Sequence, residues 1–326
     1  MEPRARFSRR RLIKLAGLLP LGAIAAACSS DDGHDESAAA AMATAANTST
    51  AVPEPTATPT PEPPFIVAAG EQHRLLMEGT PQETQLHIYG TGIEGPILAV
   101  LGGVHGNEPG GWQAAEQIRD SLRPETGALI VVPRANTLAV QQFVRTTDDL
   151  GDLNRLYPGD PNGQPMARMA YEITETLREF HATHALDLHE SWAFYRDRTE
   201  TQGGTAFLGQ TVSSSTTRGL ELGRAIVDEV NGRILSPVEE VTLRNWPPAG
   251  FVFPTATPGG PPTPTAIAGD DSLVRRRSRS SLGLSTHIPG LIALLVEMGQ
   301  QQAIERRVAL HVDIVQEAMR QVGMKS

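Results

Sequence analysis

Three largely apolar runs, each followed closely by ionisable side chains, constrain the fold of this chain most. The runs span residues 97–101, 185–188 and 291–296. Apolar runs of this length are typical of buried parallel strands, and a helix-like segment, residues 110–121, follows the first run. Alternating strand-like and helix-like runs over residues 65–326 predict an α/β fold: a doubly wound, mostly parallel mixed sheet flanked by helices. Those 262 residues suffice for one domain with a single core.

The side chains that follow the first two runs include a possible set of zinc ligands, His105, Glu108 and His189. Catalytic zinc commonly takes two His and one Glu and leaves its fourth position to a water. Since His105 and Glu108 are three positions apart, a turn or a first helical turn aims both at one ion. His181 and His184 are rival third ligands. We favour His189 because it follows its run, and open α/β sheets bind ligands at the carboxyl ends of strands.

Glu297 follows the third run, where an ionised carboxylate is costly unless it is paired or takes part in chemistry. Its expected role is general base, which takes a proton from water and delivers it to a leaving nitrogen. The alternative is a salt-bridge partner at a strand end. Between the first and second ligands, Arg155 offers a planar fork suited to a carboxylate, and Asn154 can donate a further hydrogen bond. The alternative for Arg155 is a solvated loop arginine.

Four motifs, in this order along the chain, resemble a known family. They are Gly-Gly-Val-His-Gly-Asn-Glu at 102–108, Asp-Leu-Asn-Arg-Leu-Tyr-Pro-Gly-Asp at 152–160, Asp-Leu-His-Glu at 187–190, and the glutamate at 297. Together they resemble the zinc carboxypeptidase superfamily, and most closely its succinylglutamate desuccinylase/aspartoacylase branch. The ordered combination is much more specific than any one motif.

The resemblance implies a role for each matching residue. It implies one zinc ion per chain, held by His105, Glu108 and His189, with Glu297 as the catalytic base and Asn154 and Arg155 holding a substrate carboxylate. It further implies that Asp152 orients the first ligand histidine, whose free ring nitrogen must donate to an acceptor. Arg145 matches the arginine that stabilises the oxyanion. Arg134 stays an alternative, because Arg145 and Asn154 are separated by two more residues here than the corresponding pair in aspartoacylase.

The implied activity is a zinc-dependent amidohydrolase that cleaves an N-acyl-amino acid or a similar small amide with a free carboxylate. A metallocarboxypeptidase acting on peptides or cell-wall peptides is the alternative. The desuccinylase branch usually continues into a C-terminal β-rich domain, whereas here 29 residues follow Glu297, and residues 303–322 read as one closing helix. An alternative from another class of function is a non-catalytic substrate-binding lipoprotein, which would keep the substrate pocket but catalyse no reaction.

The amino terminus, residues 1–27, resembles a twin-arginine lipoprotein signal peptide. Arginines at 9–11 precede an apolar stretch, residues 15–27, that is too short for a good membrane span. Cys28, the single cysteine, follows three alanines as in a lipobox, which predicts its lipidation; an ordinary signal with an incidental cysteine is the alternative. Residues 28–64 are rich in Ala, Thr and Pro and predict a disordered tether. We therefore expect an extracytoplasmic protein, lipid-anchored to a bacterial cell membrane.

The charge of the remaining chain argues against nucleic acid as a partner. Without residues 1–27, the chain has 22 basic and 36 acidic residues, a formal charge of −14. The expected partners are a small-molecule or peptide substrate with a free carboxylate, and the membrane. Residues 253–268 repeat the composition of the tether and predict an exposed, disordered Pro-rich loop. The basic run at 275–279 is either solvated or steers an anionic substrate.

Overall fold

The computed structural model describes residues 64–147, 149–198, 206–245 and 278–324, all within the unit formed by residues 61–326. The predicted signal peptide, Cys28, the tether up to residue 63 and the Pro-rich loop lie outside the described residues. Arg279 is the one described arginine of the basic run at 275–279. Among the described residues, no helix has the length and apolar character needed to cross a membrane.

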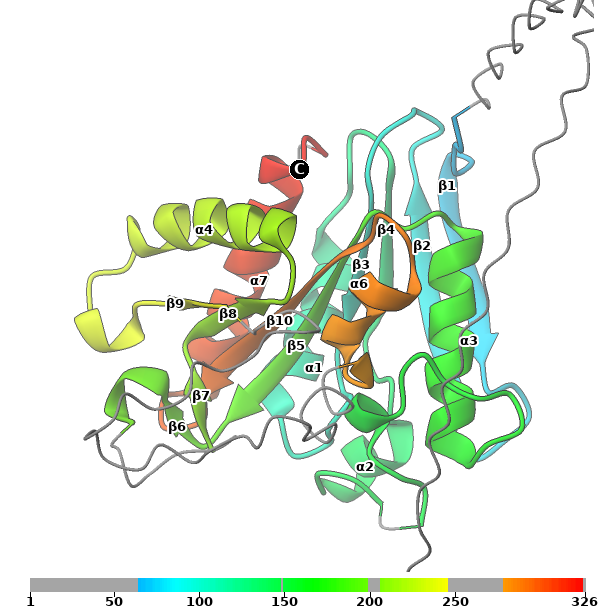
Figure 1. Ribbon diagram of the computed structural model, residues 1–326, viewed down its shortest axis with the longest axis horizontal. Helices are drawn as coiled ribbons and strands as arrows, with labels where there is room; N and C mark the ends of the chain where they lie inside the picture. The colour runs from blue at the N-terminus through cyan, green and yellow to red at the C-terminus, as the bar shows by residue number, and fades with distance from the viewer. Residues whose placement is uncertain (1–63, 148, 199–205, 246–277, 325–326) are drawn as a thin grey trace, which may run out of the picture. The chain divides into compact units, whose positions relative to one another are not determined.

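The described residues form an eight-stranded mixed sheet with helices on both faces (Figure 1). The strand order is β1-β2-β4-β3-β5-β10-β8-β9. The four central strands are mutually parallel, while antiparallel pairs join β1 to β2, β2 to β4, and β10 to β8. This architecture confirms the predicted fold class. The strands of this sheet are β1 Gly70–Leu76, β2 Thr84–Gly90, β3 Ile97–Leu101, β4 Ala128–Val132, β5 His184–Ser191, β8 Thr211–Ser214, β9 Thr242–Asn245 and β10 Ile292–Gly299.

The remaining elements of the described residues are a two-stranded sheet, six α-helices and short 3₁₀ turns. The small sheet pairs β6 Ala193–Phe194 with β7 Phe207–Gly209. Prolines stand at the start of the first and third helices, where the missing N–H costs nothing. The helices are α1 Pro109–Ser121, α2 Thr137–Gln142, α3 Pro165–Glu179, α4 Thr217–Asn231, α6 Leu284–His287 and α7 Ile304–Gln321, and the 3₁₀ turn relevant below is η1 Leu153–Arg155.

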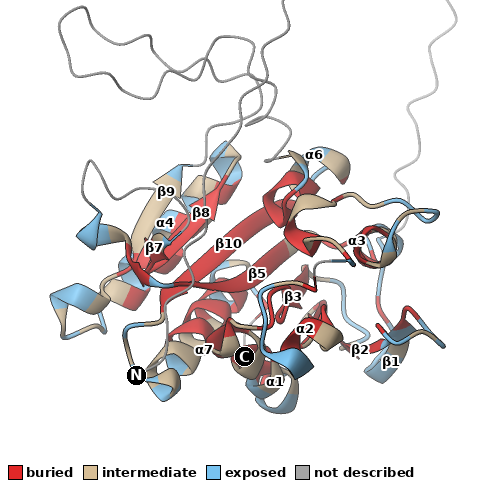
Figure 2. Cartoon of the chain, turned by 90° about the horizontal axis from the view of Figure 1, so that it is seen from below, coloured by how far each residue is buried: buried red, intermediate tan, exposed pale blue. Residues whose placement is uncertain are grey.

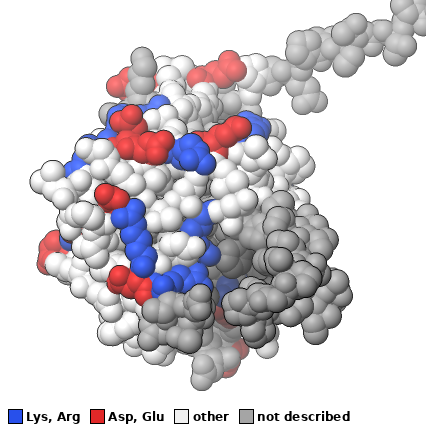
Figure 3. Space-filling model, turned by 60° about the vertical axis from the view of Figure 1, so that its left-hand side comes forward, with Lys and Arg blue, Asp and Glu red and all other residues white. Residues whose placement is uncertain are grey.

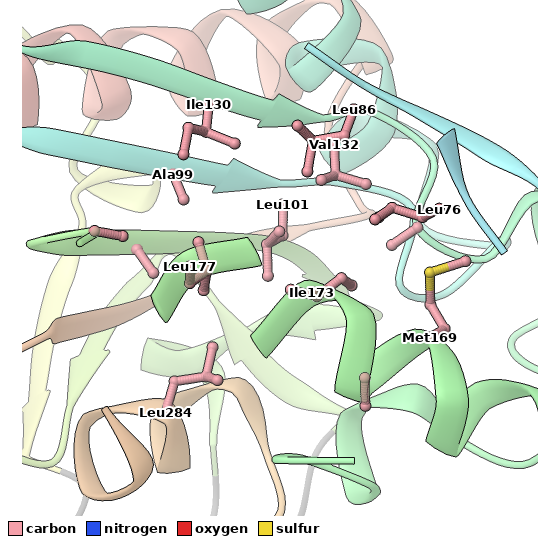
Figure 4. Close-up of a cluster of buried hydrophobic side chains, with 14 of the residues drawn as sticks. Leu76, Leu86, Ala99, Leu101, Ile130, Val132, Met169, Ile173, Leu177 and Leu284 are labelled. Atoms are coloured by element: carbon pink, nitrogen blue, oxygen red, sulfur yellow. The ribbon is translucent and has the colours of Figure 1, made fainter. Parts of the chain in front are cut away.

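The core has two layers, one on each face of the sheet. Helices α3 and α6 cover one face, and α1, α4 and α7 cover the other (Figure 1). On the first face, one stripe of α3 packs against alternate residues of β3 and β4 (Figure 4), as expected for an amphipathic helix on a pleated strand. The residues of this contact are Met169, Ile173, Leu177, Ala99, Leu101, Ile130 and Val132.

Strands β5 and β10 are longer than the sequence indicates. The predicted runs ended at residues 188 and 296, but the two strands pair in register as far as Ser191 and Gly299. His189 and Glu297 therefore lie within their strands rather than just beyond them, because backbone pairing continues past the polar side chains. Figure 2 shows both strands buried, apart from the half-buried His184 at the start of β5. The predicted closing helix matches α7 to within one residue at each end.

The surface of the described residues carries both signs of charge. On the face drawn in Figure 3, Lys and Arg side chains lie next to Asp and Glu side chains. Paired charges of this kind include Arg196 with Glu240 and Arg306 with Glu239, at N–O distances of 2.7 and 2.8 Å. Exposed pairs contribute little to stability, so the fold depends on the two core layers.

Candidate functional site

The turn after β3 brings His105 and Glu108 against His189 of β5. This turn is tight: Gly103 has a φ of 65°, and a Cβ at Gly106 would lie 1.9 Å from the carbonyl oxygen of Ala139. The Nδ1 atoms of His105 and His189 each lie 2.8 Å from a different Glu108 carboxylate oxygen, and 3.1 Å from each other. All three side chains are buried and converge closely enough to hold one metal ion.

The far ring nitrogens show that this cluster fits a cation. The Nε2 of His105 lies 3.1 Å from Asp152 Oδ1, and the Nε2 of His189 lies 2.7 Å from Asp187 Oδ2. In the neutral tautomer whose Nε2–H donates to its carboxylate, each ring directs the lone pair of Nδ1 at Glu108. Two lone pairs and a carboxylate around one point need a positive charge. Burial raises the pKa of Glu108, but the positive charge of His105 and His189 in their protonated form, with the hydrogen bonds that they then donate, outweighs burial and holds that pKa well below its usual range.

The rival histidines lie elsewhere. His184 begins β5, at the opposite end of the strand from His189. His181 stacks on Phe65, with ring centroids 4.5 Å apart. The acid that contacts the His189 ring from β5 itself is Asp187, two residues earlier on the same strand face. The carboxylate of Glu190 instead pairs with Arg307 of α7 at 2.7 Å.

Glu297 is the register partner of His189 on the neighbouring strand, so both side chains project from the same face of the sheet. The hydroxyl of Ser191 donates a 2.7 Å hydrogen bond to Glu297 Oε2. Burial is the main reason that the pKa of Glu297 rises to about 7, and the charge of Glu108 adds to it. A carboxyl group with a pKa near neutrality can both accept and donate a proton at physiological pH.

The loop before α3 supplies the other predicted residues. Asp152 caps η1 and accepts a 3.0 Å hydrogen bond from the backbone N–H of Asn154, which fixes the turn that carries Asn154 and Arg155. The Asn154 side chain accepts a 3.0 Å bond from the backbone N–H of Ser281, and its Nδ2 lies 3.4 Å from His189 Nε2. Arg155 Nη1 donates to the carbonyl oxygen of Asn154.

The structure separates the two candidates for the oxyanion arginine. Arg145 Nη1 donates to Glu108 Oε1 at 2.9 Å, and its Nη2 lies 3.6 Å from Asp152 Oδ2. Arg134 instead donates to Glu116 at 2.7 Å and lies over the ring of Trp112. Arg145 therefore lies beside the cluster of His105, Glu108 and His189, whereas Arg134 contacts helix α1.

The cluster of His105, Glu108 and His189 lines one cavity of about 310 Å³ together with Glu297, Arg145, Asn154 and Arg155. Sequence reasoning missed Arg198 and Arg244, which also line it. Arg244 lies on β9, donates to Ser213 Oγ at 3.3 Å and lies over the Tyr195 ring; burial lowers its pKa. No motif marks either arginine in the sequence. The lining residues are His105, Glu108, Arg145, Asn154, Arg155, His189, Glu190, Ser191, Arg198, Leu208, Ser213, Arg244, Ser280, Leu282, Leu295 and Glu297.

Known proteins resemble this chain in sequence and in fold. Residues 94–193 match the succinylglutamate desuccinylase/aspartoacylase catalytic domain. A 99-residue segment is 39% identical to the N-alpha-acetyl-L-2,4-diaminobutyric acid deacetylase of Halomonas elongata, and covers 29% of this chain and 29% of that protein. The chain thus matches under a third of that relative's length.

Two solved structures share the fold at low sequence identity. The apo cell shape determinant protein Csd4 from Helicobacter pylori has a TM-score of 0.58 and 17% identity, over 78% of this chain and 55% of Csd4. A succinylglutamate desuccinylase/aspartoacylase from Rhodobacter sphaeroides has a TM-score of 0.55 and 17% identity, over 79% of this chain and 68% of that one. The matched segment of residues 94–193 and the shared fold agree with the motif resemblance to the succinylglutamate desuccinylase/aspartoacylase catalytic domain.

Proposed function

We propose that the protein is a zinc-dependent amidohydrolase that cleaves an N-acyl-amino acid or a similar small amide bearing a free carboxylate. The observation that carries this proposal is the single cavity in which the cluster of His105, Glu108 and His189 lies beside Glu297. The sequence match to a catalytic domain and to a deacetylase supports the same reaction class. A binding protein needs the pocket, but it has no use for a proton-transferring carboxyl group.

His105, Glu108 and His189 would hold the ion through two Nδ1 atoms and the Glu108 carboxylate. When bound, zinc would polarise a substrate carbonyl and increase the acidity of a water. Asp152 and Asp187 keep the two imidazoles oriented by accepting from their Nε2–H groups. Imidazole and carboxylate donors are also compatible with other divalent transition metals, and the choice of zinc is part of the proposal.

Glu297 would act as the proton carrier. As a carboxylate, it takes a proton from the attacking water; as a carboxylic acid, it delivers that proton to the leaving nitrogen. Its pKa of about 7 gives access to both forms at neutral pH. Ser191 fixes one carboxylate oxygen by its hydrogen bond, which leaves the other oxygen to handle the proton.

The arginines of the cavity would bind the negative charges of the substrate and of the transition state. Arg145 lies next to Glu108, where its guanidinium can stabilise the oxyanion that develops on the attacked carbonyl. Arg155 and Asn154 would grip the free carboxylate. Arg244 and Arg198 add positive charge to the same cavity, which favours an acidic substrate.

The size of the cavity favours a small substrate over a peptide. A volume of about 310 Å³ lies at the lower end of the range for small-molecule pockets, about 300–1,000 Å³. The alternative is a carboxypeptidase acting on peptides or cell-wall peptides. One structural neighbour, the mDAP-bound form of Helicobacter pylori Csd4, is described as a D,L-carboxypeptidase, although at 19% identity it supports the fold alone. Hydrolysis of an N-acetyl- and N-succinyl-amino acid panel but not of a C-terminal peptide panel is the expected result.

The test of the mechanism is Glu297→Gln. We expect turnover on the best substrate to fall by about 10²–10⁴, while zinc content stays at one equivalent in this site. Glu305→Gln, an exposed acid on α7, is the matched control and should hydrolyse at the wild-type rate. If the chain is a substrate-binding lipoprotein, neither change alters ligand affinity and no variant shows turnover. Wild-type turnover in Glu297→Gln would refute the proposed base.

We also infer from the sequence that the protein acts outside the cytoplasm and is anchored through lipidated Cys28. The support is the twin-arginine signal pattern and the lipobox-like segment that ends at Cys28. Replacing Cys28 with Ser should move the protein from the membrane fraction to the soluble fraction of the cell envelope. Retention of Cys28→Ser in the membrane would contradict the anchor, and it would leave the proposed chemistry unaffected.

A further inference from the structure

A second group of ligating side chains lies on the β1–β2 hairpin, away from the cavity. His73 and His87 are direct cross-strand partners, and Glu71 lies two residues before His73 on the same strand face. The Glu71 Oε1 atom is 3.4 Å from His73 Nε2 and 4.0 Å from His87 Nδ1. The two imidazole rings meet edge to face with centroids 4.9 Å apart. Three potential ligand atoms thus gather over one cross-strand pair.

His87 makes this group more than a surface cluster. Only 7% of the residue is exposed, and among the described residues its buried Nδ1 has no hydrogen-bond partner. A separation of 4.0 Å from Glu71 is too long for a hydrogen bond. An unsatisfied buried nitrogen is unfavourable, and each one in a native structure calls for an explanation. A metal ion between Nδ1 and the Glu71 carboxylate would satisfy this nitrogen.

We propose that Glu71, His73 and His87 form a binding site for a divalent transition metal of the zinc class. With bonds of about 2.1 Å, tetrahedral ligand atoms lie about 3.4 Å apart. The three ligand atoms here lie within 4.8 Å of one another, so a small inward movement would bring them to that spacing. The side chains of Glu71 and His73 are 45% and 46% exposed, so they can turn the short way needed to close on an ion. His87 is fixed by burial and directs its nitrogen toward them. Two imidazoles and a carboxylate suit zinc better than magnesium or calcium.

This site is separate from the cavity described above. Two strands, β4 and β3, lie between β2 and β5 in the sheet. The proposed site bridges the edge strand β1 and its neighbour β2, where a bound ion would link two strands that otherwise depend on backbone pairing and core contacts. We therefore assign it a structural role: it stabilises the edge of the sheet that begins the described part of the chain.

Zinc titration of the purified, metal-stripped full chain tests the site. A His105→Ala/His189→Ala background removes two of the three ligands proposed for the cavity, so the outcome does not depend on the proposed enzymatic function. We expect one zinc equivalent per chain in this background by calorimetry, and a zinc-dependent rise in melting temperature. Adding His73→Asn should weaken binding at least about tenfold and abolish that rise. His73 is exposed, so this variant should keep its fold, which circular dichroism checks.

His181→Asn is the matched control, since His181 is an exposed histidine outside the group; it should keep the full zinc equivalent. In the otherwise unchanged chain, His73→Asn should lower the zinc content from two equivalents to one. The proposal is overturned if the His105→Ala/His189→Ala background binds no zinc at about 10 µM free metal. It is equally overturned if the zinc remains after His73→Asn, because the ion would then belong to other residues.

Discussion

The ion pair between Glu190 and Arg307 gives the sharpest stability prediction. Arg307 Nη1 lies 2.7 and 2.8 Å from the two carboxylate oxygens of Glu190, whose side chain is fully buried. Arg307→Met keeps the apolar stem and removes the charge, so Glu190 keeps only weaker contacts such as the 3.4 Å bond from Gln300. Breaking a buried pair in this way costs about 3–5 kcal/mol. Burial already raises the pKa of Glu190. In the variant, Glu190 can therefore take up a proton and become neutral, which limits the loss of unfolding free energy to about 3 kcal/mol.

Chemical and thermal unfolding measure this loss. For a domain of this size, about 3 kcal/mol corresponds to a fall in Tm of about 6–12 °C. Arg74→Met is the matched control, because Arg74 forms a similar two-bond pair with Glu179 on the surface, where such pairs contribute at most about 1 kcal/mol. The double variant Glu190→Gln/Arg307→Met should regain part of the loss. If Arg307→Met costs no more than Arg74→Met, the argument from burial is wrong.

Three further changes follow from the contacts of the site and the strand that carries it. Asp187→Asn weakens the acceptor that orients His189, so zinc affinity should fall by about 10–100-fold, as measured by competition with a chelating dye. Arg145→Met should lower kcat by about 10²–10³, while Arg134→Met should leave it within about twofold; equal effects would contradict the assignment of the oxyanion arginine. Burial, with the charge of Arg218 nearby, lowers the pKa of His184 in the folded chain to about 4. In the unfolded chain, this imidazole binds a proton below about pH 6.5, so between these two pH values only the unfolded chain is protonated at His184. Stability due to this residue is thus lost as pH falls, by about 2 kcal/mol at pH 4.5, and His184→Asn should reduce that loss in urea unfolding at pH 7 and pH 4.5.

The sequence was sufficient to predict the fold class, because buried parallel strands have continuous apolar runs. The first run and β3 share the same bounds, and the closing helix was predicted to within a residue. It was also sufficient to propose His105, Glu108, His189 and Glu297 as a group, since parallel strands bring their carboxyl ends to one edge. The structure brings these four side chains into one cavity.

Other parts of the site left no local signal in the sequence. Arg244 reaches the cavity only because β9 pairs with β8, and β8 with β10. The first pairing joins residues about 30 positions apart and the second joins residues about 80 positions apart. The ends of β5 and β10 could not be predicted from apolar composition, because backbone pairing continues through the polar residues that follow each apolar run. The group of Glu71, His73 and His87 depends on the register of one hairpin, and a shift of one residue would move His87 to the other face.

The alternation of β5 explains how one strand serves both the cavity and the core. Asp187, His189 and Ser191 share one face, and each contacts another residue of the cavity or its supports. On the opposite face, Leu186 and Leu188 of the core are followed by Glu190, a buried charge that Arg307 neutralises and that also borders the cavity. The backbone N–H of Glu190 also donates a 3.0 Å bond to Glu108 Oε2. The buried ion pair therefore fixes the strand segment that positions a proposed ligand, and Arg307→Met should weaken metal binding as well as stability, although Arg307 contacts no proposed ligand side chain.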